Sequence, residues 1–386
     1  MRVKLKDIFD LQMGKTPSRS NLEYWNTTDY KWISIADLTK TSKYIFETKE
    51  YLSKSAIKDS GIKVIPANTV VMSFKLSIGK TAITKEDMYS NEAIMAFKDK
   101  HVINIIPEYI FYLFKYKNWE ECSNKAVMGK TLNKATLSEI EVEICSIEKQ
   151  RQIVNILDKI MSAVDGRKQE LQLLDELIKA RFVELFGDIR CNNKLPLVKL
   201  SEFVNIGSSK RIYANEYVDK GVPFYRSKEI RELGTGMKPS VELYIKQERY
   251  DEIKEKYGVP KKGDILIAAI GATIGYSWIV DTDTPFYYKD GNLIILSIKN
   301  NVNPIFLNYT MRILIEDFKN KDVAGSAQLA LTIEKLEKMM VVNPDIKLQN
   351  QFADFVHQVN KSKVAVQKAL DETQILFDSL MQKYFG

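Results

Sequence analysis

The chain has 386 residues, 45% of them hydrophobic and 28% charged, which is typical of a folded globular protein and unlike a disordered one. At about 100–200 residues per domain, this length predicts two or three domains. The net charge of +7 permits binding to a polyanion without requiring it. We find no apolar run that could cross a membrane and no secretory signal pattern, so we expect a cytoplasmic protein. The three widely spaced cysteines indicate neither a disulfide framework nor a zinc site.

The first half of the chain opens with short β-type runs separated by turns, such as Thr69–Phe74. A short helix is predicted to begin at Pro107, because the missing N–H of proline costs nothing in the first turn of a helix. A glycine turn and a short apolar strand follow. A long helix over residues 146–190 then closes this half.

The second half repeats the same order of elements. Its strand Asp264–Ile270 and its helix start at Pro304 match the first-half features, and a long helix again closes it, over residues 346–386. Short landmarks match as well: Val3-Lys4-Leu5 corresponds to Val198-Lys199-Leu200. The offset between matching landmarks drifts by only a few residues. We therefore predict an internal duplication of one structural unit.

The two long helices carry the clearest periodicity in the sequence. Apolar residues recur at alternating spacings of four and three, which is the heptad pattern of a coiled coil. The two seams run in the same register, separated by one constant interval. The apolar seam residues are Ile153, Leu157, Ile160, Val164, Leu171, Leu174 and Ile178 in the first helix, and Phe352, Val356, Val359, Val366, Leu370, Phe377 and Leu380 in the second.

Such a seam requires a partner helix, either the other copy in the same chain or a helix of another molecule. Four seam positions are polar: Arg167, Arg181, Lys363 and Thr373. These side chains either set the register and orientation of the pair or extend their polar ends to solvent along a loosely wound seam.

Several kinds of catalytic site are disfavoured. Three Gly-Lys-Thr triplets resemble the end of a phosphate-binding loop. That loop also needs another glycine five residues before the glycine of the triplet. The chain has Phe9, Phe74 and Asn124 at those positions. With only two histidines, His101 and His357, histidine-based acid–base or metal chemistry is disfavoured too.

The glycines of these triplets recur in the second half, where the residues after them differ. Gly14 matches Gly207 and Gly79 matches Gly275, but Lys-Thr is replaced by Ser-Ser and by Tyr-Ser. Retained turns with altered polar neighbours are expected of a common scaffold whose loops bind two different ligands. Sequence drift in surface loops is the alternative.

Two globular regions, each followed by a long heptad helix in matching register, resemble the specificity subunits of type I restriction-modification enzymes. The segments Met128–Leu137 and Val323–Leu336 resemble the family's passage from recognition domain to helix. The segments Ile147–Ile153 and Ile346–Phe352 resemble its Glu-Gln-x-x-Ile helix start, although the first motif position is lysine or leucine here and the usual proline pair is missing.

The resemblance implies an α+β fold with two target-recognition domains, residues 1–145 and 191–345, each a mixed sheet plus short helices. The long helices, residues 146–190 and 346–386, would form an antiparallel coiled coil. The chain would read a bipartite, asymmetric duplex DNA target and hold no active site, metal or cofactor of its own. Two modification subunits would supply S-adenosylmethionine and adenine methylation, and restriction subunits would supply ATP- and Mg-dependent translocation and cleavage.

Residue chemistry at the turns suggests candidate DNA contacts. Arginine and lysine bind phosphate or guanine, asparagine and glutamine read adenine, and aromatic side chains stack or pack. For any one of these residues, a solvated turn is the alternative. The candidates are Lys15, Arg19, Lys75, Lys80, Lys130, Asn133 and Lys134 in the first half, and Ser209, Lys210, Arg211, Arg226, Lys228, Tyr276, Ser326 and Gln328 in the second.

Two other functions stay open at this point. A coiled-coil scaffold that binds only proteins would have the same helices, but it would lack the salt-dependent DNA affinity of a protein that contacts several phosphates. A stand-alone nuclease or methyltransferase would turn over DNA without partner subunits.

Overall fold

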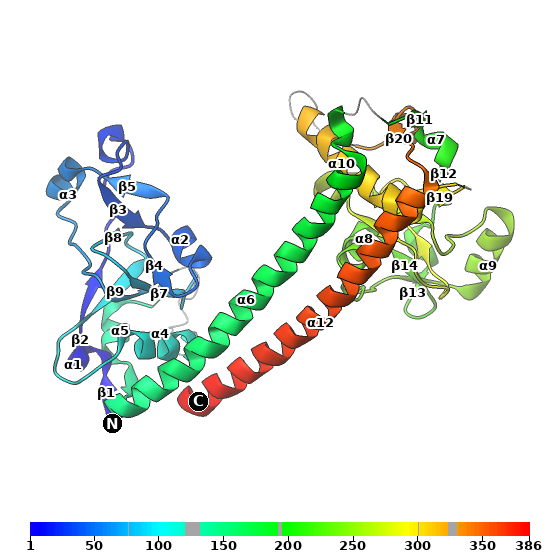
Figure 1. The fold of residues 1–386 in the computed structure, drawn as a ribbon. Helices are drawn as coiled ribbons and strands as arrows, with labels where there is room; N and C mark the ends of the chain where they lie inside the picture. The colour runs from blue at the N-terminus through cyan, green and yellow to red at the C-terminus, as the bar shows by residue number, and fades with distance from the viewer. Residues whose placement is uncertain (76, 120–131, 192–194, 300, 323–329) are drawn as a thin grey trace. The chain divides into compact units, whose positions relative to one another are not determined.

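The computed structural model describes residues 1–75, 77–119, 132–191, 195–299, 301–322 and 330–386 (Figure 1). These residues form two compact units. The first unit is Met1–Gln169 with Gln367–Gly386, and the second is Glu170–Val366. Each unit therefore combines a globular region with one end of each long helix. The sequence-based domain boundaries instead kept each helix whole, and they stay a prediction.

The first globular region contains two larger sheets and one strand pair. The orders are β2-β9-β6-β7-β4, β5-β3-β8 and β1-β10, antiparallel except for the parallel pairs β4–β7 and β3–β8. The strands are β1 (Arg2–Lys4), β2 (Phe9–Met13), β3 (Tyr30–Ile33), β4 (Tyr44–Ile45), β5 (Glu50–Leu52), β6 (Val70–Ser73), β7 (Thr81–Thr84), β8 (Tyr89–Ser90), β9 (Ile94–Asp99) and β10 (Glu141–Glu143). The helices are α1 (Leu5–Ile8), η1 (Leu22–Tyr24), α2 (Ile35–Lys40), α3 (Lys54–Ser60), α4 (Pro107–Tyr116) and α5 (Lys134–Glu139).

The second globular region repeats this plan. Its sheets have the orders β12-β19-β16-β17, β13-β15-β14-β18 and β11-β20. The strands are β11 (Leu197–Lys199), β12 (Val204–Gly207), β13 (Tyr217–Val218), β14 (Val222–Tyr225), β15 (Tyr244–Ile245), β16 (Ile265–Ala268), β17 (Ser277–Ile279), β18 (Tyr287–Tyr288), β19 (Leu293–Ile298) and β20 (Met340–Val342). The helices are η2 (Ile189–Cys191), α7 (Leu200–Phe203), η3 (Ala214–Glu216), α8 (Ser227–Gly234), α9 (Gln247–Lys256), η4 (Gly271–Thr273), α10 (Pro304–Asp322) and α11 (Ile333–Glu337).

The predicted duplication is thus confirmed: the order β2-β9-β6-β7 recurs as β12-β19-β16-β17 and β5-β3-β8 as β15-β14-β18, whereas among the described residues β4 and β13 each occur in one region only. The predicted strands appear as β6 and β16, and helices α4 and α10 begin at their prolines. Both strands are entirely apolar or small and buried on both faces, because successive side chains point to opposite sides of a sheet. Val70 and Met72 enter one core while Val71 enters another. In β16, Ile265 and Leu266 separate in the same way.

The long helices are α6 (Ile147–Phe186) and α12 (Ile346–Phe385). In the first unit, Leu157 near the start of α6 shares a core with Phe377 near the end of α12. In the second unit, Phe182 near the end of α6 packs against Phe352 near the start of α12, and their ring centroids lie 5.3 Å apart. Within each unit, the start of one helix packs against the end of the other. The predicted antiparallel pairing within one chain is therefore confirmed.

Helix α6 ends at Phe186 rather than at residue 190. Gly187 follows in the left-handed conformation, with φ of 72°, and donates its N–H to the Val183 carbonyl at 2.8 Å. Such a glycine satisfies a terminal carbonyl and stops the helix. The short helix η2 forms after it.

The predicted seam residues are all buried or half-buried in the structure. Among the polar seam residues, Lys363 donates to Asp175 of α6 at 2.7 Å, and Arg181 lies 5.7 Å from the Phe355 ring centroid. Thr373 instead donates to the Ala369 carbonyl of its own helix. Two of the polar seam side chains therefore contact the facing helix.

A buried glutamine attaches each globular region to its long helix. The Gln150 side-chain oxygen accepts the Ile106 N–H at 2.9 Å, where α4 begins. The side-chain NH₂ of Gln150 donates to the backbone carbonyls of Asn104 and Cys145. In the second copy, Gln349 accepts the Asn303 N–H at 2.9 Å before α10. This glutamine is the one in the helix-start motif.

Among the described residues, no helix is both long and apolar enough to span a membrane.

Candidate nucleic-acid interface

The loop after β2 carries the first candidate contacts. Lys15 donates its backbone N–H to the Ser90 carbonyl at 2.8 Å, and its Nζ donates to the Ser60 carbonyl. Gly14 must be glycine, because a Cβ there would lie 2.2 Å from the Asn91 carbonyl oxygen. Lys15 is exposed, but its ammonium is engaged with the protein backbone in this structure.

Arg19 fastens the same loop to the sheet β5-β3-β8. Its guanidinium carbon lies 3.7 Å from the Trp25 ring centroid and 4.9 Å from that of Trp32, and Nη2 donates to Glu50 at 3.1 Å. Stacking on aromatic faces and pairing with a carboxylate both favour a fixed guanidinium. Half of the Arg19 side chain nevertheless stays exposed. Arg19 therefore holds the loop in place and keeps surface available to a ligand.

The remaining candidates of the first region lie on other segments. Lys80 donates to the Thr39 hydroxyl of α2 at 2.6 Å, and Lys75 lies near the Phe74 ring. Both lysines are half-buried. Each is packed against its own region rather than extended into solvent.

Asn133 caps helix α5, since its side-chain oxygen accepts the Thr136 N–H at 2.8 Å. The side-chain oxygen of Asn133 therefore already accepts a hydrogen bond within the protein, and its side-chain NH₂ is the group left to contact a ligand. Lys134 follows it and is exposed. Lys130 lies outside the described residues.

In the second region, the loop after β12 holds three adjacent candidates. Lys210 donates its N–H to the Tyr287 hydroxyl at 2.6 Å, and Arg211 donates from Nε to Asp290 at 2.8 Å. Ser209 beside them is half-buried, whereas most of the Arg211 side chain is exposed. This loop is therefore tied to β18 and to the residues after it, as the first-region loop is tied to β8.

Tyr276 lies in the turn before β17 and is 37% exposed. Ser326 and Gln328 lie outside the described residues.

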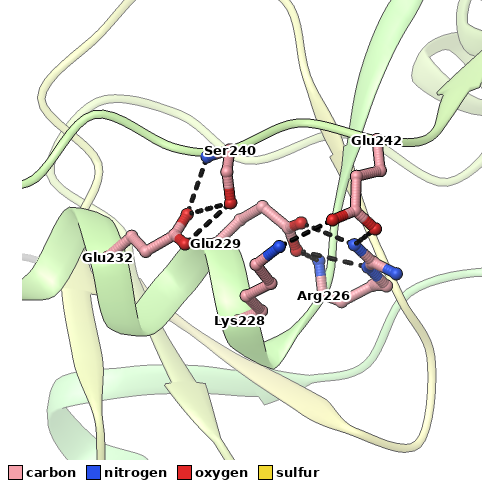
Figure 2. A network of polar contacts seen from close by, with 6 residues as sticks. All are labelled: Arg226, Lys228, Glu229, Glu232, Ser240 and Glu242. Carbon is pink, nitrogen blue, oxygen red and sulfur yellow. Dashed lines mark hydrogen bonds and ion pairs between the residues drawn. The ribbon is translucent and has the colours of Figure 1, made fainter. Parts of the chain in front are cut away.

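Arg226 and Lys228 are the candidates that the structure brings together most closely (Figure 2). Arg226 follows β14 directly, and its backbone N–H, Nε and Nη2 all donate to the Glu229 carboxylate. Nη2 also donates to Glu242 at 2.9 Å, and Lys228 donates to the other oxygen of Glu242 at 2.6 Å. Glu229 is fully buried, whereas Glu242 is 56% exposed. One carboxylate is thus internal and the other faces solvent.

A second buried carboxylate positions the segment that carries Glu242. Glu232 of α8 accepts the backbone N–H of Ser240 at 2.7 Å and also its hydroxyl (Figure 2). Lys228 and Arg226 lower the pKa of Glu242 to about 2, chiefly through their hydrogen bonds. Glu242 is therefore ionised at neutral pH and balances two cations.

The family model for the type I restriction modification DNA specificity domain matches residues 1–176 and again residues 194–373. The chain belongs to this specificity family. The two matches follow the two copies seen in the fold, which confirms the resemblance proposed from the sequence.

Curated members of the specificity family align over most of the chain. The type I restriction enzyme MjaIX specificity subunit of Methanocaldococcus jannaschii is 23% identical over 414 residues, covering 98% of this chain and 91% of that protein. The type I restriction enzyme EcoprrI specificity subunit of Escherichia coli is 21% identical over 376 residues, covering 89% of this chain and 84% of that protein.

Solved structures share the fold. The S subunit of a type I restriction-modification system from M. genitalium superposes with a TM-score of 0.58 at 15% identity, covering all of this chain and 96% of that one. A chain from a structural study of complex assembly and conformational transition in a type I system gives a TM-score of 0.61 at 17% identity, with 100% and 97% covered.

In this specificity-family chain, the first-region equivalent of Arg226 is Ser34. Each follows the strand that pairs in parallel with β8 or β18. The Ser34 N–H and hydroxyl donate to Asp37 at 2.9 and 2.7 Å, as Arg226 donates to Glu229. The Ser-x-x-Asp spacing matches a capping-box pattern, whereas Arg-x-x-Glu does not, because arginine cannot accept a backbone N–H. Sequence reasoning did not identify Asp37 or Glu229 as functional residues. No local sequence pattern pointed to Glu242.

Proposed function

We propose that the chain recognises a bipartite, asymmetric duplex DNA target, with one half-site read by each globular region. The observation that carries this proposal is one scaffold occurring twice with different side chains at equivalent positions, such as Ser34 and Arg226. Similar scaffolds favour similar docking on two half-sites, and different side chains favour different bases. A target of two unlike halves follows.

We further propose that the chain is the non-catalytic subunit of a larger enzyme. The relatives named above are specificity subunits of type I restriction enzymes. In such an assembly, modification subunits would carry S-adenosylmethionine and methylate adenine, and restriction subunits would use ATP and Mg. The chain's own residues would bind and orient the DNA.

Exchanging residues 191–345 for the equivalent region of another family member tests the proposal. We expect the exchange to change one half-site and leave the other half-site intact, because each region reads separately. The measurement is sequencing of methylated sites after co-expression with the modification subunits. Changes in both half-sites, or in neither, would contradict the proposal.

A chain that binds only proteins would behave differently in solution. Assembled with a modification subunit, the chain should retain duplex DNA at low salt and release it steeply as salt rises. No retention at low salt would support the scaffold function instead.

A further inference from the structure

We propose that Arg226 reads a guanine in one half-site of the target, an inference that rests on the DNA-reading function proposed above. In this assignment Glu229 orients the guanidinium. Glu242 is a counter-ion that holds Arg226 and Lys228 in the free chain and yields them to DNA. Lys228 then binds a neighbouring phosphate.

The hydrogen bonds to Glu229 occupy only one edge of the Arg226 guanidinium, and 28% of the side chain is exposed. Glu229 occupies the edge formed by Nε and Nη2, at 3.4 and 2.9 Å. The other bidentate edge is formed by Nη1 and Nη2, and Nη1 has no dashed contact to the residues drawn in Figure 2. Two parallel N–H donors match the O6 and N7 acceptors of guanine in the major groove. Glu242 accepts from Nη2 at 2.9 Å and so covers part of that edge.

The two carboxylates differ in how firmly they hold Arg226. Glu229 is 0% exposed, so removing its partner would leave a buried charge uncompensated. Glu242 and Lys228 have 56% and 43% of their side chains exposed, and exposed ion pairs contribute little. DNA can therefore displace Glu242 at small cost while Glu229 keeps the guanidinium oriented.

A fixed guanidinium is better suited to recognising a base than to binding a phosphate. A phosphate contact needs charge and tolerates mobility, whereas a bidentate base contact needs a defined plane and direction. The Arg226 guanidinium donates to the Glu229 carboxylate from both Nε and Nη2, and the same carboxylate accepts the Arg226 backbone N–H. Lys228, with a single partner, has the freedom suited to phosphate.

The duplication provides an internal control for the structural role of Arg226. In the first region, the Ser34 N–H donates to Asp37 as the Arg226 N–H donates to Glu229, and the Ser34 hydroxyl also accepts the Asp37 N–H to cap helix α2. Serine is thus sufficient for this helix start, and the guanidinium at the second copy is additional to folding. The double variant Arg226→Ser/Glu229→Asp transplants the first-region cap into the second region.

The test uses the full chain assembled with its modification subunits and a randomised duplex DNA pool, with sequencing of the bound fraction. We expect the double variant to lose preference for guanine at one position of one half-site, by roughly 10- to 100-fold, the value of one bidentate contact. The other half-site should be unchanged. Arg231→Ser, which removes the same charge from an exposed position of α8, should alter neither half-site.

The other outcomes are decisive as well. Retention of every base preference would overturn the assignment, and so would an even loss of binding with all preferences kept, which marks a phosphate contact. If the wild-type assembly enriched no sequence at all, the proposed function itself would fail. Should the double variant not fold, Arg226→Gln is the substitute, since glutamine pairs with adenine rather than guanine and should move the preference at that position from guanine to adenine.

A second variant tests the role of Glu242 with an opposite sign. Glu242→Gln removes the counter-ion's charge while preserving its size, so we expect tighter duplex binding with the same base preferences. If Glu242 were instead a structural support for Arg226, this variant would bind DNA more weakly. Weaker binding would therefore refute the counter-ion role.

Discussion

At the scale of single residues, the duplicated glutamines have the clearest structural role. Gln150 and Gln349 are almost fully buried, at 0% and 1% exposure, and each satisfies backbone groups just before a helix, α4 or α10. Buried backbone groups need partners, and an amide side chain supplies both a donor and an acceptor. This explains why the helix-start motif carries glutamine in both copies while its neighbours differ.

The variant Gln150→Leu should destabilise the first unit by about 1–3 kcal/mol for each buried group left without a partner. Leucine has similar size but cannot accept the Ile106 N–H or donate to the Asn104 carbonyl. The measurement is the midpoint of chemical unfolding. Gln152→Leu, at an exposed position of the same helix, is the control. Equal midpoints for the two variants would show that the amide contributes nothing.

At the scale of elements, one ion pair joins the first globular region to α6. Lys43 is only 7% exposed and donates to Asp158 of α6 at 2.6 Å, and the Tyr112 hydroxyl of α4 donates to the same carboxylate. Burial and the hydrogen bond to Asp158 raise the pKa of Tyr112, which therefore stays protonated as a donor. Three elements thus meet at one carboxylate.

Asp158→Ala should destabilise the first unit, because it leaves the buried Lys43 ammonium without its partner. Asp158 itself is 41% exposed, so solvent reduces the penalty to about 1–3 kcal/mol. Thermal unfolding measures the change, with Asp165→Ala at an exposed position of α6 as the control. A destabilisation no larger than that of the control would rule out the linking role of the ion pair.

At the scale of the whole molecule, two long helices connect the two units. Their apolar seams share one register, and each unit pairs the start of one helix with the end of the other. We expect this pair to set the length of the unread gap between the half-sites, because an α-helix rises about 1.5 Å per residue and resists compression.

Adding one heptad to both α6 and α12, at matched positions of the pair, should lengthen the gap while keeping both half-sites. A whole heptad keeps the seam in register, which a shorter insertion would break. Sequencing of methylated sites reports the gap directly. A gap unchanged by the insertion would mean that the helices do not act as the spacer.

The mixed-sheet scaffold and the antiparallel pairing were implied by the resemblance to the specificity subunits. The order of amino acids alone was sufficient to predict the duplication, the helix starts and the heptad seams. These features depend on local periodicity and on landmarks repeated along the chain, such as the seam through Leu157 and Phe377 and the helix starts at Pro107 and Pro304. Both kinds of signal are written in short stretches of sequence. Their physical causes, burial of an apolar stripe and the missing N–H of proline, act within one element.

Only the tertiary structure decided how the candidate contacts are used. Arg19 stacks on Trp25 and pairs with Glu50, and Arg226, immediately before α8, pairs with Glu242, in the segment after α8. The two ion pairs join residues 31 and 16 positions apart along the chain, and no spacing rule predicts them. The sequence could therefore name basic side chains at turns. The packing of the strands and loops decides which cations are held by carboxylates and which edge of the Arg226 guanidinium Glu229 occupies.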